Sequence, residues 1–394
     1  MKKFILLTIV FLFTIIVNAQ WSEPSPVAWN SQNVYSIISD GTNIFAGTGS
    51  AGVSLSTNNG TNWTAVNNGL TSTGINSFAI DGTNVFAAGE GIFLTTNNGG
   101  LWTSVINGIT DTTVNALTIS GTNIYAGTDG GVFLSTNNGG LWTAANNGFN
   151  GQVIAIATDG TNIFTGTGNY GVYLSTNNGG LWTEVNNGLT NNNVNTIAIS
   201  GTNIFAGTGG DGVFLSTNNG GLWTAVNNGL TNMNVYSLLI SGTNIFAGTD
   251  DGVFYSNNNG SSWTAISDGF PANTAVWTLA ISGTNIFAGI HLDPRGVWMR
   301  PLSEVITGFT VIRDYNTFNL YPNPASDIIT VNTERNSNTD LTLSIFNVMG
   351  KLVKTEKLKQ DQQQINIGNL TNGIYIIEIK TKECTEKQKL IIQK

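Results

Sequence analysis

Basic side chains are nearly absent from the first three quarters of this sequence. Residues 20–302 contain no lysine and only two arginines, against thirteen aspartates and glutamates, so this part carries a net charge of −11. It lacks the basic contacts that nucleic acid phosphates require, which argues against nucleic acid as a partner. The 394 residues include one cysteine and one histidine, too few for a disulfide framework or a Cys/His zinc cluster. We therefore expect no cofactor and no metal.

Long apolar runs are also lacking, with one exception at the amino terminus. A lysine pair at 2–3 precedes an apolar run at 4–17, and the small-residue cleavage pattern Val-Asn-Ala lies at 17–19. This order is typical of a secretory signal peptide, which we assign to residues 1–19. An uncleaved anchor helix is the alternative, although fourteen apolar residues are short for a bilayer. No later stretch predicts a transmembrane segment.

Glycine is abundant, and many of the 48 glycines belong to an internal repeat. The tripeptide Gly-Thr-Asn recurs seven times at intervals of 39 to 41 residues. A fixed period near 40 residues indicates an array of one supersecondary unit. The copies begin at Gly41, Gly82, Gly121, Gly160, Gly201, Gly242 and Gly283.

Each period contains four short runs of β-branched and aromatic residues between Gly/Asn clusters. In the fifth period these runs lie at 194–199, 203–206, 212–216 and 222–226. Such runs predict strands, and the continuous apolar character of the second and third indicates burial on both faces. We therefore predict an all-β fold, a seven-bladed β-propeller over residues 20–302.

The seventh period, residues 276–300, has three such runs and lacks the fourth. The missing strand would carry a tryptophan followed by serine or threonine. Trp21 and Ser22 form such a pair 42 residues before Trp63, which is one period upstream. We predict that this N-terminal strand completes the last blade and leaves the ring without an open edge.

Six periods contain the motif Ser/Thr-x-Asn-x-Gly-x-x-Trp. It resembles the Asp-box, or BNR repeat, with asparagine in place of the aspartate. The resemblance implies a propeller like those of sialidases, sortilin-type receptors, some xyloglucanases and photosystem assembly factors. We interpret the asparagines as turn-forming and the tryptophans as core residues, with sugar stacking on the tryptophans as the alternative. These residues are Asn58, Trp63, Asn97, Trp102, Asn137, Trp142, Asn177, Trp182, Asn218, Trp223, Asn258 and Trp263.

The loops between the second and third strands differ most from repeat to repeat. Strand connectivity places them on one face of the disc, together with the loops that lead into the next blade and opposite the Asp-box turns. Residues that depart from the repeat do not share its structural role, so we regard them as ligand-binding candidates; sequence drift at exposed loop tips is the alternative. The candidates are Glu90, Asp129, Tyr170, Asp211, Asp250, Asp251, His291, Asp293 and Arg295.

Catalysis has little support in the sequence, and we predict no catalytic residue. Sialidases of this fold use an arginine triad, whereas the propeller region has only Arg295 and Arg300. A glycosidase needs two carboxyl groups about 5 to 10 Å apart, and no such pair stands out, since the adjacent Asp250 and Asp251 would point to opposite faces of a strand. We expect a non-catalytic binding or interaction module for a polysaccharide or a surface protein. A carbohydrate-active enzyme, a glycoside hydrolase, is the alternative.

Lysine-bearing, alternating sequence begins near residue 318 and contains six strand-like runs, which predict a small Ig-like β-sandwich over 318–394 after a linker at 303–317. Several motifs in this tail resemble the type A C-terminal sorting domain of the type IX secretion system. The resemblance implies that the type IX machinery is a partner, and that the protein passes through the periplasm to the outer cell surface or the medium. A sugar-binding or adhesive module is the alternative. The motif residues are Tyr321, Pro322, Asn323, Pro324, Gly350, Gly373 and Tyr375.

Overall fold

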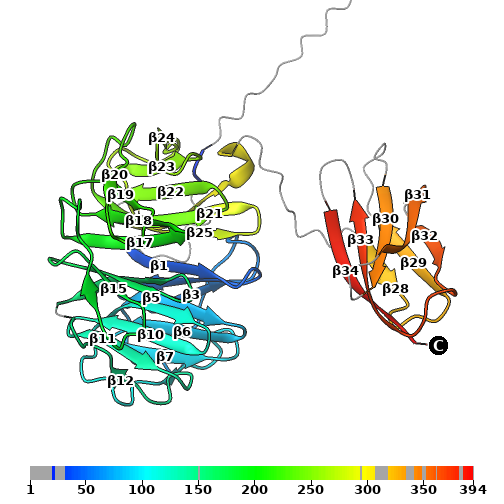
Figure 1. Ribbon diagram of the computed structural model, residues 1–394, viewed down its shortest axis with the longest axis horizontal. Helices are drawn as coiled ribbons and strands as arrows, with labels where there is room; N and C mark the ends of the chain where they lie inside the picture. The colour runs from blue at the N-terminus through cyan, green and yellow to red at the C-terminus, as the bar shows by residue number, and fades with distance from the viewer. Residues whose placement is uncertain are drawn as a thin grey trace, which may run out of the picture. The chain divides into compact units, whose positions relative to one another are not determined.

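The chain forms two compact units that divide between Val305 and Ile306 (Figure 1). The computed structural model describes residues 20–22, 32–149, 151–292, 295–306, 318–333, 341–347, 352–360, 362–380 and 385–393. The predicted signal peptide, Asp293, Gly350 and most of the predicted linker lie outside these residues. Apart from one short 3-10 helix, η1 (Leu302–Glu304), every regular element in the described ranges is a strand. Both units are therefore all-β.

The described residues of the first unit form seven antiparallel sheets, and in each sheet the strands follow chain order. The first sheet has β1 (Val34–Ser39), β2 (Ile44–Thr48), β3 (Val53–Ser56) and β4 (Thr64–Ala65), and the second has β5 (Ile75–Asp81), β6 (Asn84–Gly89), β7 (Gly91–Thr95) and β8 (Thr103–Ser104). The third has β9 (Val114–Ser120), β10 (Asn123–Thr128), β11 (Gly131–Ser135) and β12 (Thr143–Ala144), and the fourth has β13 (Val153–Thr158), β14 (Ile163–Thr167), β15 (Val172–Ser175) and β16 (Thr183–Glu184). The fifth has β17 (Val194–Ser200), β18 (Asn203–Thr208), β19 (Val213–Ser216) and β20 (Thr224–Ala225), the sixth has β21 (Val235–Ser241), β22 (Asn244–Thr249), β23 (Gly252–Ser256) and β24 (Thr264–Ala265), and the seventh has β25 (Ala275–Ser282), β26 (Asn285–His291) and β27 (Gly296–Pro301).

The hydrophobic core lies between successive sheets. The second strands are buried almost throughout, as in β18, because a strand covered on both faces has apolar or small residues at consecutive positions. One apolar cluster joins Phe86 of the second sheet to Leu117 and Phe133 of the third. The fourth strands have two residues each, both exposed, which keeps the outer edges too short for pairing with another chain.

The first strand of each sheet lies beside the first strand of the next, and β25 of the last sheet lies beside β1 of the first. In Figure 1 the blue β1 accordingly lies next to β25, although more than 200 residues separate them. Val34 and Ile44 of the first sheet share an apolar cluster with Phe287 and Val297 of the seventh. The first and last sheets of the unit are therefore packed as neighbours.

The motif with asparagine and tryptophan forms a turn between the third and fourth strands, which we call the box turn. In the third sheet, Ser135 Oγ lies 3.0 Å from Asn137 Oδ1 and accepts a hydrogen bond of 2.9 Å from the N–H of Gly139. Asn137 Oδ1 also accepts a hydrogen bond of 2.9 Å from the N–H of Leu141. The side chains therefore satisfy turn amides that no strand partner reaches, and the same bonds recur in the other five box turns.

The box-turn tryptophans pack between sheets. Trp142 is 1% exposed, and its Nε1 donates a 2.7 Å hydrogen bond to the carbonyl of Val105 in the preceding sheet. Its backbone N–H donates to the carbonyl of Asn107 at 2.8 Å. The indoles of Trp102, Trp182, Trp223 and Trp263 make the same bond to their preceding sheets. Trp63 departs from the pattern, since it is only partly buried and its Nε1 donates to Gly60 within its own turn.

Trp142→Ala is expected to destabilise the first unit by about 3–5 kcal/mol, because it leaves a cavity between two sheets and removes the bond to Val105. The melting temperature should fall by several degrees, measured by differential scanning calorimetry, with ligand binding retained. Leu141→Ala, at a side chain 48% exposed on the same turn, is the control and should change the melting temperature little. Wild-type melting of Trp142→Ala would show that this indole carries no inter-sheet packing.

Trp21 lies against the sixth and seventh sheets in the same way. Its Nε1 donates to the carbonyl of Ile266 at 2.7 Å and its N–H to that of Asp268 at 2.7 Å, which repeats the pattern of the other indoles. Ser22 exchanges two backbone hydrogen bonds of 2.9 Å with Met299 of β27. Gly269 has φ +100°, and a Cβ there would clash with the backbone of Trp21. The residues beside the predicted cleavage site thus pair with the last strand of the unit.

The second unit consists of two antiparallel sheets over one core. One sheet has the order β28 (Phe318–Tyr321), β29 (Ile328–Thr333), β32 (Gln362–Asn366), and the other has the order β31 (Leu352–Leu358), β30 (Leu341–Asn347), β33 (Gly373–Lys380), β34 (Thr385–Ile392). Ile329 and Val331 of the first sheet share a buried cluster with Leu343, Ile345 and Ile377 of the second. The described strands number seven, so the prediction of six was wrong: it missed β28, a short run that precedes a proline.

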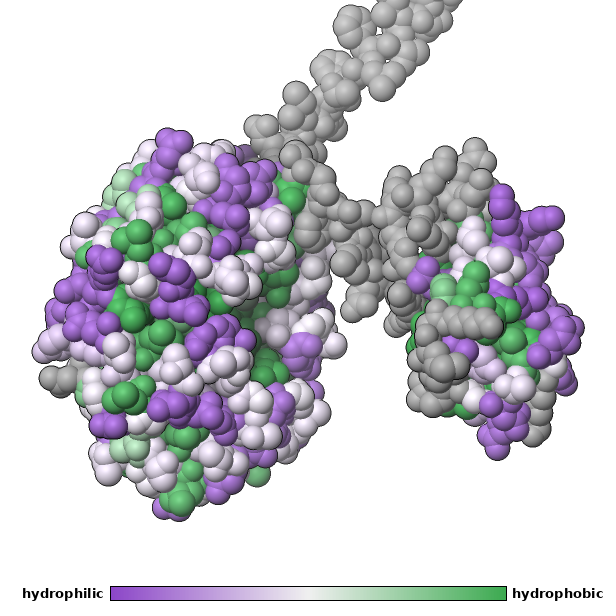
Figure 2. Space-filling model, in the orientation of Figure 1, coloured by the Kyte–Doolittle hydropathy of each residue, from purple (hydrophilic) through white to green (hydrophobic). Residues whose placement is uncertain are grey.

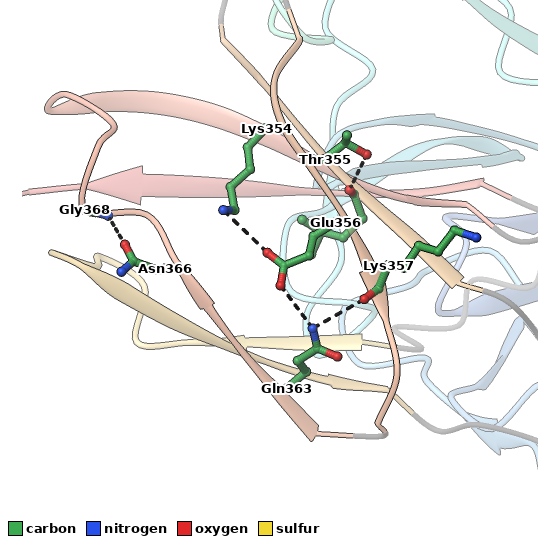
Figure 3. A network of polar contacts seen from close by, with 8 residues as sticks. Lys354, Thr355, Glu356, Lys357, Gln363, Asn366 and Gly368 are labelled. Atoms are coloured by element: carbon green, nitrogen blue, oxygen red, sulfur yellow. Dashed lines mark hydrogen bonds and ion pairs between the residues drawn. The ribbon is translucent and has the colours of Figure 1, made fainter.

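A polar network joins the two sheets of this unit at one margin (Figure 3). Gln363 of β32 donates its Nε2 to Glu356 Oε1 at 3.3 Å and to the carbonyl of Lys357 at 3.5 Å, both in β31. Glu356 also pairs with Lys354 Nζ at 3.5 Å. Exposed ion pairs of this kind contribute less than about 1 kcal/mol, so the shared apolar core is the main source of stability.

Candidate functional site

The variable loops gather on one face of the first unit, as strand connectivity predicts. The N–H of Gly52, between the second and third strands, donates a 2.8 Å hydrogen bond to the carbonyl of Thr73, in the loop that leads to the next sheet. The same bond recurs at Gly91, Gly171, Gly212 and Gly252. Both sets of loops therefore lie at the same ends of the sheets. We call this side the loop face.

A β-bulge marks the loop-face end of every first strand. In β1, Val34 and Ser36 pair with the neighbouring residues Thr48 and Gly47, so Tyr35 is left outside the ladder. The same shift occurs in the other six sheets. A bulge redirects the side chain of the extra residue, so one side chain in each sheet is set apart from the regular alternation. The bulged residues are Tyr35, Asn76, Asn115, Ile154, Asn195, Tyr236 and Trp277.

Three of the bulged residues are asparagines that hold neighbouring sheets together. Asn76 Nδ2 donates to the carbonyl of Val114 at 3.1 Å, and Asn195 Nδ2 donates to that of Val235 at 3.0 Å. Asn115 makes the corresponding bond to Val153 at 3.0 Å. At this position the repeat therefore has a side-chain amide that donates a hydrogen bond to the next sheet, an interaction that we call the clip.

Aromatic side chains replace the clip in three consecutive sheets. The ring of Trp277 lies 5.2 Å from Tyr236 and 5.3 Å from Tyr35, with interplanar angles of 29° and 25°. His291, at the end of β26, stacks on Trp277 at 3.8 Å and 13°. We call Tyr236, Trp277, Tyr35 and His291 the aromatic row. All four side chains are half-buried, so they combine a fixed position with a solvent-facing part.

Polar groups fix the two ends of the aromatic row. Asn234 donates its Nδ2 to Tyr236 Oη at 2.8 Å and to Asp250 Oδ2 at 2.7 Å. Burial raises the pKa of Tyr236 to about 12, and its hydrogen bond to the Asp250 carboxylate contributes to this rise. Burial lowers the pKa of His291 below its ordinary value, Arg295 lowers it further, and Asp250 opposes both. At neutral pH the aromatic row therefore presents a protonated phenol and a neutral imidazole.

The indole Nε1 of Trp277 is buried and has no hydrogen-bond partner among the described residues. Thr165 Oγ1, Ser237 Oγ, Trp298 Nε1 and Arg300 Nε share this property. No group of three or more histidine, cysteine or acidic side chains suited to a metal ion occurs in the described part of the chain. The aromatic row is thus the most distinctive chemical feature of the loop face.

A second arrangement joins the predicted sorting motif to the last strand of the second unit. Asn323 Oδ1 accepts a 2.9 Å hydrogen bond from the N–H of Ile391. The backbone of Ala325 donates to Ile391 and accepts from Gln393, at 2.9 and 2.8 Å, as a parallel bridge to β34. Tyr321 Oη accepts a hydrogen bond of 2.6 Å from Gln362 Nε2. Tyr375 Oη donates a hydrogen bond of 3.0 Å to the carbonyl of Thr371.

Residues 319–393 match a family model described as a secretion system C-terminal sorting domain. The tail is a sorting domain of the type IX secretion system. It implies export of the protein to the cell surface or the medium, and the match confirms the prediction of a secretion sorting domain in the tail. Within the sorting domain, Asn323 and the segment through Ala325 hold the last strand in place. None of the helices in the described ranges has the length and apolar character needed to span a bilayer.

Solved structures give the first unit the fold of a β-propeller, since the WD40 beta propeller domain of Doa1 is similar with a TM-score of 0.58 and 14% identity, over 72% of this chain and 97% of that one. The structure of YCF48 bound to D1 peptide is similar with a TM-score of 0.59 and 12% identity, over 71% of this chain and 94% of that one. PorZ, an essential surface component of the type-IX secretion system of Porphyromonas gingivalis, has a TM-score of 0.53 and 14% identity, over 94% of this chain and 61% of PorZ. The GH74 enzyme of Niastella koreensis has a TM-score of 0.54 and 18% identity, over 68% of this chain and 43% of the enzyme. At these identities the similarity shows the fold alone, and no curated protein matches the sequence.

Two of the predicted ligand-face residues, Asp250 and His291, lie together at the aromatic row, with Arg295 close enough to affect His291. The other described candidates lie in separate sheets of the propeller. Asp129 accepts hydrogen bonds from Asn115 and Gln152. The backbone of Glu90 contacts Ser72 and Thr113, and Tyr170 is 47% exposed. Asp211 accepts a hydrogen bond from Thr190, and Asp251 accepts one from the N–H of Asn273.

The sequence interpretation overlooked Tyr35, Tyr236 and Trp277. A signal for them was present, because the residue after the buried valine or isoleucine of each first strand is asparagine in three repeats and aromatic in another three. The three aromatic repeats are the sixth, the seventh and the first, which a closed ring makes neighbours. Their juxtaposition depends on β25 lying beside β1.

Proposed function

We propose that the chain is an exported, non-catalytic binding protein, in which residues 20–302 form one closed seven-bladed propeller that meets its ligand with the loop face. Three features support the closed ring: β25 lies beside β1, the first and seventh sheets share a core cluster, and Trp21 repeats the indole contacts of the box turns. The box turns act as structural Asp-boxes. Their asparagine side chains stabilise the turn, and their tryptophan side chains pack in the core.

The remaining parts of the chain serve delivery. Residues 1–19 act as a signal peptide, 303–317 as a linker, and 318–394 as an Ig-like sorting domain recognised by the type IX machinery. This route ends at the outer surface or in the medium, where a polysaccharide or a surface protein is the ligand. Of the candidate loop residues, Asp250, His291 and Arg295 lie at or near the aromatic row, and Glu90, Asp129, Tyr170 and Asp211 belong to loops of other sheets.

The aromatic row is the observation that carries the binding function. At the bulge position, asparagine provides a clip between sheets, and three consecutive sheets replace it with rings that remain partly exposed. Stability alone does not require aromatic side chains at this position, since the hydrogen bond of the asparagine already joins neighbouring sheets. Half-buried aromatic side chains beside fixed polar groups are typical of recognition surfaces.

Binding can be distinguished from turnover with the purified mature chain. We expect retention on a polysaccharide or on an isolated outer-surface protein in a solid-phase assay, with no release of reducing sugar from the same polysaccharides. Sugar release that disappears when one loop-face carboxyl group, such as Asp250, is replaced by asparagine would overturn the proposal and establish a glycoside hydrolase instead.

A further inference from the structure

We propose that the asparagines in the turns after the fourth strands are deamidation sites, at which the propeller gains negative charge without an enzyme. Five sheets carry the dipeptide Asn-Gly in this turn, which we call the exit turn. The inference concerns a covalent modification of the chain and does not depend on the ligand of the loop face. The pairs are Asn68-Gly69, Asn107-Gly108, Asn147-Gly148, Asn187-Gly188 and Asn228-Gly229.

Deamidation of an asparagine requires the backbone nitrogen of the next residue, and glycine obstructs this nitrogen least because it has no side chain. The glycine nitrogen loses its proton to a solvent base and bonds to the side-chain carbon Cγ of the asparagine. The bond between Cγ and the side-chain nitrogen breaks, and ammonia leaves a cyclic imide behind. Water then opens the imide to aspartate or isoaspartate, and no oxidation or reduction takes place. The reaction therefore needs a glycine N–H that solvent can reach.

The exit turns expose this N–H. In the fifth sheet, Asn228 and Gly229 are the central residues of a turn that is closed by a 2.9 Å hydrogen bond from the N–H of Leu230 to the carbonyl of Asn227. Both central residues are exposed, and the N–H of Gly229 has no acceptor among the described residues. The other four exit turns have the same closing bond, the same exposure and the same free glycine N–H within the described part of the chain.

The six box turns contain the same dipeptide but protect it. Gly139 is buried, and its N–H donates a 2.9 Å hydrogen bond to Ser135 Oγ. The preceding Asn138 has φ +55°, whereas the exit-turn asparagines do not have positive φ, so the central peptide is oriented differently in the two turns. A buried and hydrogen-bonded N–H meets solvent only when the turn opens locally. The box turns are thus an internal reference with the same dipeptide and the opposite exposure.

Side-chain contacts rank the exit turns among themselves. Asn68, Asn147 and Asn187 donate their Nδ2 atoms to box-turn carbonyls of the next sheet at 3.1, 3.2 and 3.2 Å, and Asn107 does so at 3.4 Å. Such a bond holds the side-chain amide in place. The side-chain amide of Asn228 has no hydrogen-bond partner among the described residues, so Asn228 should react first.

The sixth sheet indicates that the fold accommodates the acidic product. Its exit turn has Asp268-Gly269 instead of Asn-Gly, and the N–H of Phe270 closes it on the carbonyl of Ser267 at 3.0 Å. Asp268 lies close enough to Arg300 to interact with its charge. The asparagine turns have no lysine to play this part, since residues 20–302 contain none. Deamidation there adds uncompensated negative charge and, in four turns, weakens a bond to the next sheet.

The test is peptide mapping by mass spectrometry of the purified mature chain, sampled during incubation in mildly alkaline buffer. Chymotrypsin is the suitable protease, because residues 20–294 contain no lysine or arginine for trypsin. Exit-turn pairs should convert at least about tenfold faster than box-turn pairs, whose N–H reacts only through local opening, and Asn228 should convert first. In urea, where both turns are lost, the two sets should convert at similar rates.

Two variants sharpen the comparison. Ser135→Ala removes the acceptor of the Gly139 N–H and should accelerate conversion of Asn138 without affecting the other pairs. Asn228→Gln should abolish conversion at position 228, because the longer side chain forms its cyclic imide far more slowly, and it should leave the other exit turns unchanged. Equal rates at exit and box turns in the folded chain would overturn the proposal, as would unreacted exit turns in a folded chain whose urea-treated sample converts.

Discussion

Deletion of residues 318–394 should abolish export and leave the propeller in the periplasm. The deletion removes the whole sorting domain, including the motif segment that pairs with the last strand. The propeller has its own core clusters among the described residues, so the truncated chain should fold. Cell fractionation with immunoblotting, combined with protease accessibility on intact cells, measures where the protein accumulates.

Gln363→Ala in the full chain is the control for this experiment. It removes the hydrogen bonds of Gln363 to Glu356 and Lys357 (Figure 3) and the one that Gln363 accepts from the N–H of Lys359, each of which contributes about 1 kcal/mol, and it should leave export unchanged. A melting curve of the truncated propeller checks that it is folded. Arrival of folded, truncated protein in the medium or at the surface would show that the tail is not required for sorting.

The all-β class and the sorting tail were predictable from the sequence, because both are encoded in local patterns. Four runs of apolar residues recur in each period, and the burial of the second strands follows directly from their composition. Strand lengths were less predictable. The fourth run of the fifth period, 222–226, forms only the two-residue β20, because the N–H of Trp223 and its indole both bond to the preceding sheet and so leave the ladder.

The aromatic row was not predicted, although the closed ring expected from the sequence already placed the first repeat beside the seventh. Tyr35 meets Trp277 only when β1 packs beside β25. The bulge that sets these residues apart is a feature of strand register. No turn residue in the sequence indicates where the bulge lies. The sequence interpretation looked for function in variable loops, and therefore found Asp250 and His291 but missed the rings beside them.

The visible surface of the propeller has scattered apolar areas. Figure 2 shows small apolar areas separated by polar ones on the visible face of the first unit. Its most exposed large apolar side chains, among the described residues, include the leucines of four box turns, Leu101, Leu141, Leu181 and Leu222. Three of them pack against a glycine of the neighbouring sheet's loop, which gives them a structural role at the ends of the sheets.

Trp21→Ala should be the most destabilising single substitution in the propeller. The side chain is 2% exposed, donates to the carbonyl of Ile266 at 2.7 Å and stacks on Phe270 at 4.8 Å. Removal of a buried tryptophan costs about 3–5 kcal/mol. In the described residues 20–22 the backbone makes two hydrogen bonds to Met299 and one to Asp268, so loss of the indole should also release this segment and expose the edge of β27.

Urea denaturation of the mature chain measures the change in unfolding free energy, and hydrogen exchange of the Met299 amide, which donates to Ser22, reports release of the segment. Both should change in Trp21→Ala, whereas Ser22→Ala, at an exposed side chain whose backbone pairing remains, should behave like wild type. Trp142→Ala is the second comparison: it removes an equivalent indole in the middle of the chain, so it should lower the free energy without accelerating exchange at Met299. If Trp21→Ala matches the wild type in both measurements, the ring is closed by the contact of β1 with β25 alone, and the N-terminal strand contributes nothing to it.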